Sequence, residues 1–86
     1  MTVKEFFVNR NKSYSVKTHM RAKDNDLRDD GITGFFMPDD LIKAFPNNEC
    51  WEESYEKDYG DGAVAIRSFF VLIVDSQNIV DEWRRK

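Results

Sequence analysis

Residues 59–74 read YGDGAVAIRSFFVLIV, and they give the strongest indication of the fold. Its first four residues, Tyr59-Gly60-Asp61-Gly62, are a turn signal, because glycine adopts the positive backbone angles that tight hairpins require. Residues 63–74 are rich in Val, Ile and Phe, and their second half is apolar at every position. That pattern is typical of a central strand covered on both faces. The stretch therefore predicts a hairpin that leads into the central strand of a sheet.

The segment before the turn carries Trp51, Tyr55 and Tyr59, which stand four residues apart. This spacing fits one face of a helix and also one face of a strand, so it leaves both structures open. The turn that follows favours a strand. Further upstream, residues 13–22 alternate between polar and apolar side chains, which predicts a half-buried strand. Its outer face would be basic, with Ser13, Ser15, Lys17, His19 and Arg21.

Short helices are predicted near the amino terminus and in the middle of the chain. Thr2 and Glu5 have the spacing of a capping box, which favours a short helix over a strand for the residues that follow. Pro38 suits a first helical position, and Pro46 ends the same segment. Two acidic residues follow Pro38, where a helix dipole favours negative charge.

Three segments connect or extend these elements. Residues 23–31 are polar and without periodicity, which is typical of a loop, and residues 32–37 fit a short strand or an extended segment. Residues 76–86 fit either a further strand or a helix, and Ser76 as a possible N-cap favours the helix.

Together these segments predict a single small α+β domain over residues 1–86. We expect an antiparallel sheet of three to four strands with two or three short helices packed on one face. A chain of 86 residues buries only about 60–65% of its unfolded surface, so one modest core is expected. Seven Phe, three Tyr and two Trp indicate a core built largely on aromatic side chains.

Charge divides unevenly along the chain. Residues 1–28 contain seven Lys or Arg against three Asp or Glu, a balance of +4. Residues 29–75 contain three Lys or Arg against eleven Asp or Glu, a balance of −8. The net charge of −3 is therefore the sum of a basic amino-terminal part and an acidic central part, and the electric field of such a chain can steer a charged partner.

The sequence offers no catalytic or cofactor motif. Its one Cys and one His, Cys50 and His19, stand 31 positions apart and belong to no nucleophile motif. One His and one Cys cannot supply the four ligands of a structural zinc site. We therefore expect a protein that is not an enzyme and that uses no cofactor or metal. The longest apolar run, residues 69–74, is far shorter than the ~20 residues of a membrane span, and a cytoplasmic location is the default expectation.

Two surfaces remain as candidate binding sites. In the first, carboxylates interleave with aromatic residues, which would supply both steering charge and rigid anchors for a basic protein surface. We expect an inhibitor or adaptor of a nucleic-acid-processing protein, of the immunity, antitoxin-like or phage counter-defence type. The residues predicted to bind this partner are Trp51, Glu52, Glu53, Tyr55, Glu56, Asp58, Tyr59 and Asp61.

The second surface is the basic face near the amino terminus. Its cations could follow a phosphate backbone, so the alternative function is an RNA- or DNA-binding module. The residues predicted to make this contact are Lys12, Lys17, His19, Arg21 and Lys23.

Overall fold

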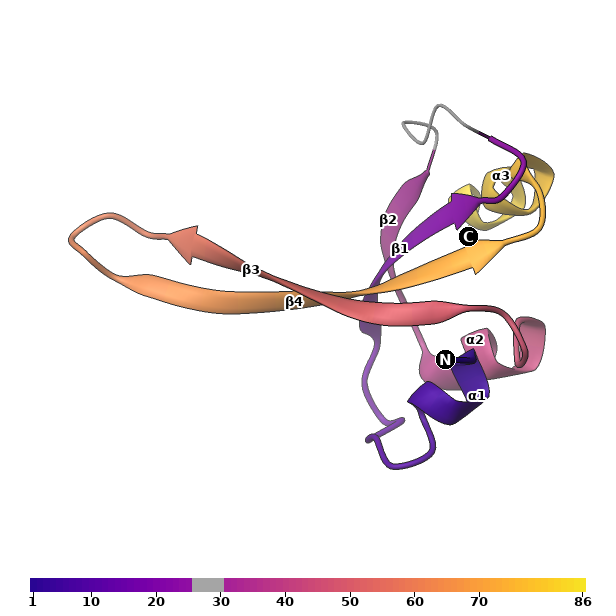
Figure 1. Cartoon of the computed structure of the whole chain (residues 1–86), viewed down its shortest axis with the longest axis horizontal. Coiled ribbons are helices and arrows are strands. Elements are labelled where there is room, and N and C mark those ends of the chain that lie inside the picture. The colour runs from indigo at the N-terminus through magenta and orange to yellow at the C-terminus, as the bar shows by residue number, and fades with distance from the viewer. Residues whose placement is uncertain (26–30) are drawn as a thin grey trace.

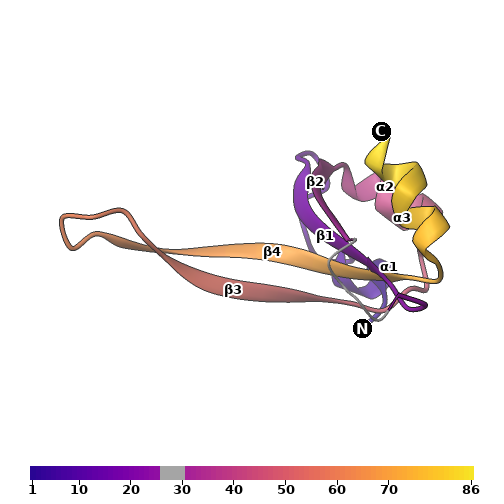
Figure 2. The same cartoon turned by 90° about the horizontal axis from the view of Figure 1, so that it is seen from above.

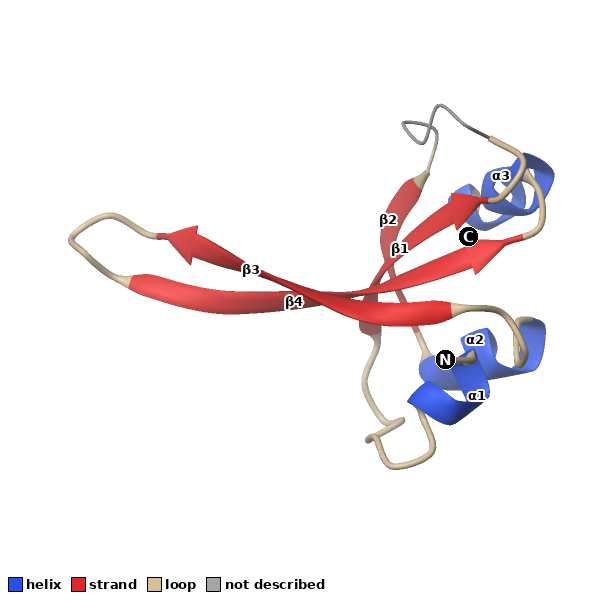
Figure 3. Ribbon diagram, in the orientation of Figure 1, coloured by secondary structure: helices blue, strands red, loops and turns tan. Residues whose placement is uncertain are grey.

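The computed structural model, which describes residues 1–25 and 31–86, has three short helices against one face of a four-stranded sheet (Figures 1 and 3). The predicted α+β fold is therefore confirmed. In chain order the elements are α1 (Val3–Phe6), β1 (Val16–Ala22), β2 (Ile32–Phe36), α2 (Pro38–Ala44), β3 (Cys50–Asp58), β4 (Val64–Val74) and α3 (Gln77–Arg84).

The sheet has the strand order β2-β1-β4-β3 and is mostly antiparallel, as predicted. Strands β1 and β2 pair antiparallel, as do β3 and β4. The central pair departs from the prediction, because β1 and β4 run parallel from Thr18 opposite Phe70 to Ala22 opposite Val74. No hairpin joins these two strands, so a turn does not fix their relative direction.

Local sequence signals fix the ends of α1 and α2. The Glu5 backbone N–H donates to the Thr2 hydroxyl at 3.2 Å, and the Thr2 backbone N–H donates to the Glu5 carboxylate at 2.9 Å. The predicted capping box is thus present, and the bond from the Thr2 backbone is the main cause that lowers the pKa of Glu5. Pro38 begins α2 as expected, with Asp39 and Asp40 in its first turn.

The carboxyl-terminal segment forms the helix α3 with Ser76 at its N-cap, as predicted, but the Ser76 side chain does not cap the helix. Ser76 occupies the N-cap position without a side-chain hydrogen bond to the helix. The Gln77 backbone N–H instead donates to Asp24 Oδ1 at 3.0 Å, so the helix start is held by a residue far away in the sequence. Asp24 belongs to the loop predicted over residues 23–31, of which residues 26–30 lie outside the described part of the chain.

Aromatic rings join the helices to the sheet. The Phe70 ring of β4 lies 4.7 Å from the Phe6 ring and 5.4 Å from the Phe7 ring, measured between centroids. On the other side of the core, the Trp83 ring of α3 lies 5.1 Å from the rings of both Phe36 and Phe45. The predicted aromatic core is present, and aliphatic residues from the same face of the sheet complete it: Met20, Leu72 and Val74.

The β3–β4 hairpin extends well beyond this core (Figures 1 and 2). Strand β1 pairs with β4 only from Phe70 onward, so among the described strands the outer half of β4 is paired with β3 alone. We call residues 54–68, from the Ser54–Ser68 pair to the turn, the arm. The coverage on both faces that was predicted for the apolar second half of this strand is confirmed for residues 70–72, which are buried.

The turn at the tip of the arm is the one predicted from its glycines. Gly60, Asp61 and Gly62 all have positive φ angles, of 80°, 53° and 77°. The Gly60 backbone N–H donates to Asp58 Oδ1 at 2.8 Å, which fixes the start of the turn.

Candidate functional site

Successive side chains along each strand point to opposite faces of the sheet, and this alternation separates most of the acidic residues from the basic ones. We call the face that carries Met20 and Leu72 the helix-side face, and the opposite one the open face. Along the four strands the helix-side face has three carboxylates and no Lys or Arg, whereas the open face has four cations and one carboxylate. The helix-side carboxylates are Glu52, Glu56 and Asp58, and the open-face charges are Lys17, Arg21, Lys57, Arg67 and Glu53.

This alternation divides the predicted acidic and aromatic surface. Trp51, Glu53 and Tyr55 point to the open face, and Tyr59 continues that row at the base of the turn. Glu52, Glu56 and Asp58 point to the helix-side face, while Asp61 lies in the turn. The sequence contained a signal for this division. Once residues 51–59 are read as a strand, a period of two separates the aromatic positions from these three acidic ones.

The helix-side face of the arm combines carboxylates with exposed aliphatic side chains. Glu56 stands opposite Ile66, and Asp58 stands opposite Val64. Ile66 is 67% exposed and Val64 is 57% exposed. We call this surface the acid–aliphatic face; it comprises Ser54, Glu56, Asp58, Val64, Ile66 and Ser68. Neither Val64 nor Ile66 was among the residues predicted from the sequence to bind a partner.

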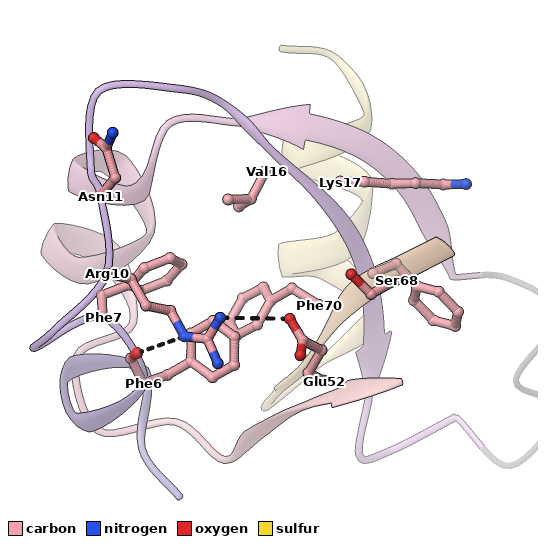
Figure 4. Close-up of a pocket in the computed structure, with 10 residues that line it drawn as sticks. Phe6, Phe7, Arg10, Asn11, Val16, Lys17, Glu52, Ser68 and Phe70 are labelled. Atoms are coloured by element: carbon pink, nitrogen blue, oxygen red, sulfur yellow. Dashed lines mark hydrogen bonds and ion pairs between the residues drawn. The ribbon is translucent and has the colours of Figure 1, made fainter. Parts of the chain in front are cut away.

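A hollow of about 390 Å³ lies at the root of this face (Figure 4). The rings of Phe6 and Phe70 line it, and Arg10 and Glu52 form an ion pair of 3.5 Å across it. The Arg10 guanidinium also lies 4.0 Å from the centroid of the Phe6 ring and donates to the Phe6 carbonyl. Ser68 belongs to both surfaces, so the hollow continues the acid–aliphatic face toward α1.

The open face holds a second, smaller hollow of about 200 Å³, where β1 meets the base of the arm. Lys17 donates from Nζ to the Tyr55 hydroxyl at 3.4 Å, and its ammonium lies 5.6 Å from the centroid of the Tyr55 ring. His19 Nδ1 lies 3.0 Å from the Thr33 hydroxyl oxygen. The Phe69 ring lies between the rings of Tyr55 and His19, and its centroid is 6.1 Å from that of Tyr55 and 6.4 Å from that of His19.

The structure brings together three of the five residues in the predicted basic face. Lys17, His19 and Arg21 share the open face of β1 and line its hollow. Lys12 lies in the loop between α1 and β1. Lys23 follows the end of β1 and forms an ion pair of 3.6 Å with Asp75.

Cys50 and His19 lie on opposite faces of the sheet, so they do not form a catalytic pair. Cys50 is 1% exposed, and burial raises the pKa of its thiol to about 11, which keeps the thiol protonated. Burial, followed by the charge of Arg21, lowers the pKa of His19, while Glu53 opposes this shift. The hydrogen bond from Arg67 to the Tyr59 hydroxyl raises the pKa of Arg67, which remains a fixed cation.

Neither a metal site nor a membrane span was found among residues 1–25 and 31–86. No three His, Cys, Asp or Glu side chains of this part of the chain are grouped as ligands. None of its helices has the length and apolar character to cross a membrane. Comparison with protein-family models, curated proteins and solved structures gave no match.

Proposed function

We propose that this chain is a non-enzymatic binding protein that lays the acid–aliphatic face of its arm against a basic protein surface. The observation that carries this proposal is the pair of exposed aliphatic residues, Val64 and Ile66, on an arm whose facing side chains are carboxylates. Apolar side chains supply binding energy when they are desolvated, and carboxylates steer the encounter with Lys and Arg.

The isolated position of the arm supports the same conclusion. A two-stranded hairpin with no further cover is marginally stable in water, so a partner that covers one face would stabilise it. Within residues 1–25 and 31–86, no strand pairs with either backbone edge of the outer arm, because β3 is an edge strand and β4 meets β1 only from Phe70. Such edges can add hydrogen bonds to a partner strand.

The hollow beside Phe6 supplies a second point of attachment. An apolar side chain of the partner could enter it against the rings of Phe6 and Phe70 while the rest of the partner follows the arm. Buried anchors of this kind dominate the energy of many interfaces. Proteins that process nucleic acids present Lys and Arg to the phosphate backbone, so we propose that the chain acts as an inhibitor or adaptor of such a protein.

Charge reversal on the arm tests this proposal. Proteins that co-purify with the wild type from its native cell should no longer co-purify with the Glu56→Lys variant. They should still co-purify with the control variant Glu82→Lys, which changes the net charge by the same amount but lies on α3 and not on the arm. With the purified partner, Glu56→Lys should lower the association rate constant and flatten its salt dependence. Ile66→Ser should weaken binding by about 1.5–3 kcal/mol, whereas Val8→Ser, at an equally exposed site, should not.

Two results would contradict the proposal. The first is a partner that lacks a basic surface. The second is an association rate that responds equally to Glu56→Lys and Glu82→Lys, because the effect would then come from net charge and not from the arm.

A further inference from the structure

The open face of the sheet has a composition opposite to that of the acid–aliphatic face. Within the four strands, its charged residues are Lys17, Arg21, Lys57, Arg67 and one carboxylate, Glu53. None of the four cations forms an ion pair with a carboxylate of residues 1–25 or 31–86. Lys17, Lys57 and Arg67 instead contact tyrosine hydroxyls or rings, which do not neutralise their charge, so this face can attract an anion although the chain as a whole is acidic.

Aromatic rings alternate with these cations across the face. Phe35 on β2 stands opposite Lys17 on β1 and is 68% exposed. Phe69 follows on β4, and Tyr55, on β3, is 39% exposed beside it. Arg67 stands opposite Tyr55 and continues the row toward the tip of the arm.

We propose that this open face binds single-stranded nucleic acid. The cations would contact phosphates, and the exposed rings of Phe35 and Tyr55 would stack on bases. Stacking platforms interleaved with cations are the means by which many proteins hold single strands, whose bases are free to unstack. Paired bases within a duplex cannot reach such rings, so the combination of rings and cations favours a single strand.

This site differs in its residues from the basic surface predicted from the sequence. Lys17, His19 and Arg21 remain in it, whereas Lys12 and Lys23 lie outside the strands. The structure adds Phe35 and Arg67 from strands that the sequence alone did not place beside β1. The hollow lined by Lys17, Tyr55 and Phe69 is the centre of the site.

Fluorescence anisotropy with labelled oligonucleotides tests the proposal on the intact chain. The probes are a single-stranded oligo(dT), an oligo(U) of the same length and a DNA duplex, each in low salt. We expect both single strands to bind more tightly than the duplex. Lys17→Ala with Arg21→Ala should weaken binding and reduce the slope of log K against log salt by about 1.4, which is 0.7 for each phosphate contact. The matched control, Lys4→Ala with Lys43→Ala, removes the same charge from the helices and should change neither.

Aromatic stacking is tested separately from charge. Phe35→Ala should weaken single-strand binding about tenfold, because stacking on an aromatic ring contributes roughly 1–3 kcal/mol per base. Circular dichroism should show that this exposed position is not needed for folding. Glu56→Lys, on the acid–aliphatic face, should not weaken oligonucleotide binding, so failure of this proposal and failure of the arm proposal can be distinguished.

Three results would overturn the proposal. They are the absence of oligonucleotide binding in low salt, equal affinity for duplex and single strand with no effect of Phe35→Ala, and equal losses in the two double variants. Loss of a protein partner from Phe35→Ala, with no oligonucleotide bound by the wild type, would reassign the open face to protein binding.

Discussion

Strand β4 allows the same aliphatic truncation to be compared inside and outside the core. Leu72 and Ile66 lie six residues apart on one strand and point to the same helix-side face. Leu72 is fully buried opposite Cys50, whereas Ile66 is 67% exposed opposite Glu56. The two substitutions, Leu72→Ala and Ile66→Ala, therefore differ mainly in what covers the side chain.

The expected losses of unfolding free energy are well separated. Burial of a Leu side chain contributes about 1.5–3 kcal/mol, and the cavity left by truncation brings the expected cost of Leu72→Ala to about 2–5 kcal/mol. This is a large fraction of the roughly 5–15 kcal/mol that stabilises a typical domain. Two thirds of Ile66 is already in water, so Ile66→Ala should change stability by about 0.5 kcal/mol or less.

Urea unfolding followed by circular dichroism measures both values, and equal m-values would show that the two variants unfold like the wild type. Ile66→Ala should nevertheless weaken binding to the protein partner, since this residue is exposed on the arm. A loss of unfolding free energy from Ile66→Ala as large as that from Leu72→Ala would contradict this prediction. It would mean that the arm is packed against the rest of the chain and is not available to a partner.

Three further predictions concern single side chains. In urea titrations, Asp24→Ala should lower the unfolding free energy by about 1 kcal/mol, because the Asp24 carboxylate accepts the first backbone N–H of α3. Ser76→Ala should lower it clearly less, since the Ser76 side chain makes no such bond. Equal losses in the two variants would contradict this prediction. Because the pKa of His19 is lowered in the folded protein, the unfolded chain binds a proton at His19 more tightly than the folded chain does. The unfolding free energy of the wild type, relative to that of His19→Gln, should therefore fall as the pH drops below 6.5. The same difference between the two proteins at pH 7.5 and pH 5.5 would exclude this effect. Because the Cys50 thiol is buried and protonated, it should react with a thiol reagent at pH 8 only when the chain unfolds. Cys50→Ala should keep partner binding. Rapid labelling of the folded protein would contradict the prediction, since it would show that the thiol is accessible.

Much of the fold could be predicted because its signals are local. The alternation predicted over residues 13–22, of which residues 16–22 form β1, the glycine turn after Tyr59 and the capping box at Thr2 each involve neighbours in the sequence. Their geometry depends on backbone angles and on hydrogen bonds over a few residues, so composition and spacing suffice to predict them.

The candidate site was only partly predictable. The sequence indicated that carboxylates and aromatic rings are concentrated in residues 51–61, and this remains the region of the arm. It did not indicate that Val64 and Ile66 stay exposed. That outcome depends on the length of β1, which pairs with β4 only from Phe70, and on the helices, which cover only the inner half of the sheet.

The local elements and the uneven distribution of charge along the chain follow directly from the order of the amino acids. Which charges share a surface depends on how the strands pair. The parallel pairing of β1 with β4 places Lys17 near Phe69, and the pleat separates Glu56 from Tyr55 although they are adjacent in sequence. The physical reason is that strand pairing joins residues far apart along the chain, and a period of two sends adjacent side chains to opposite faces.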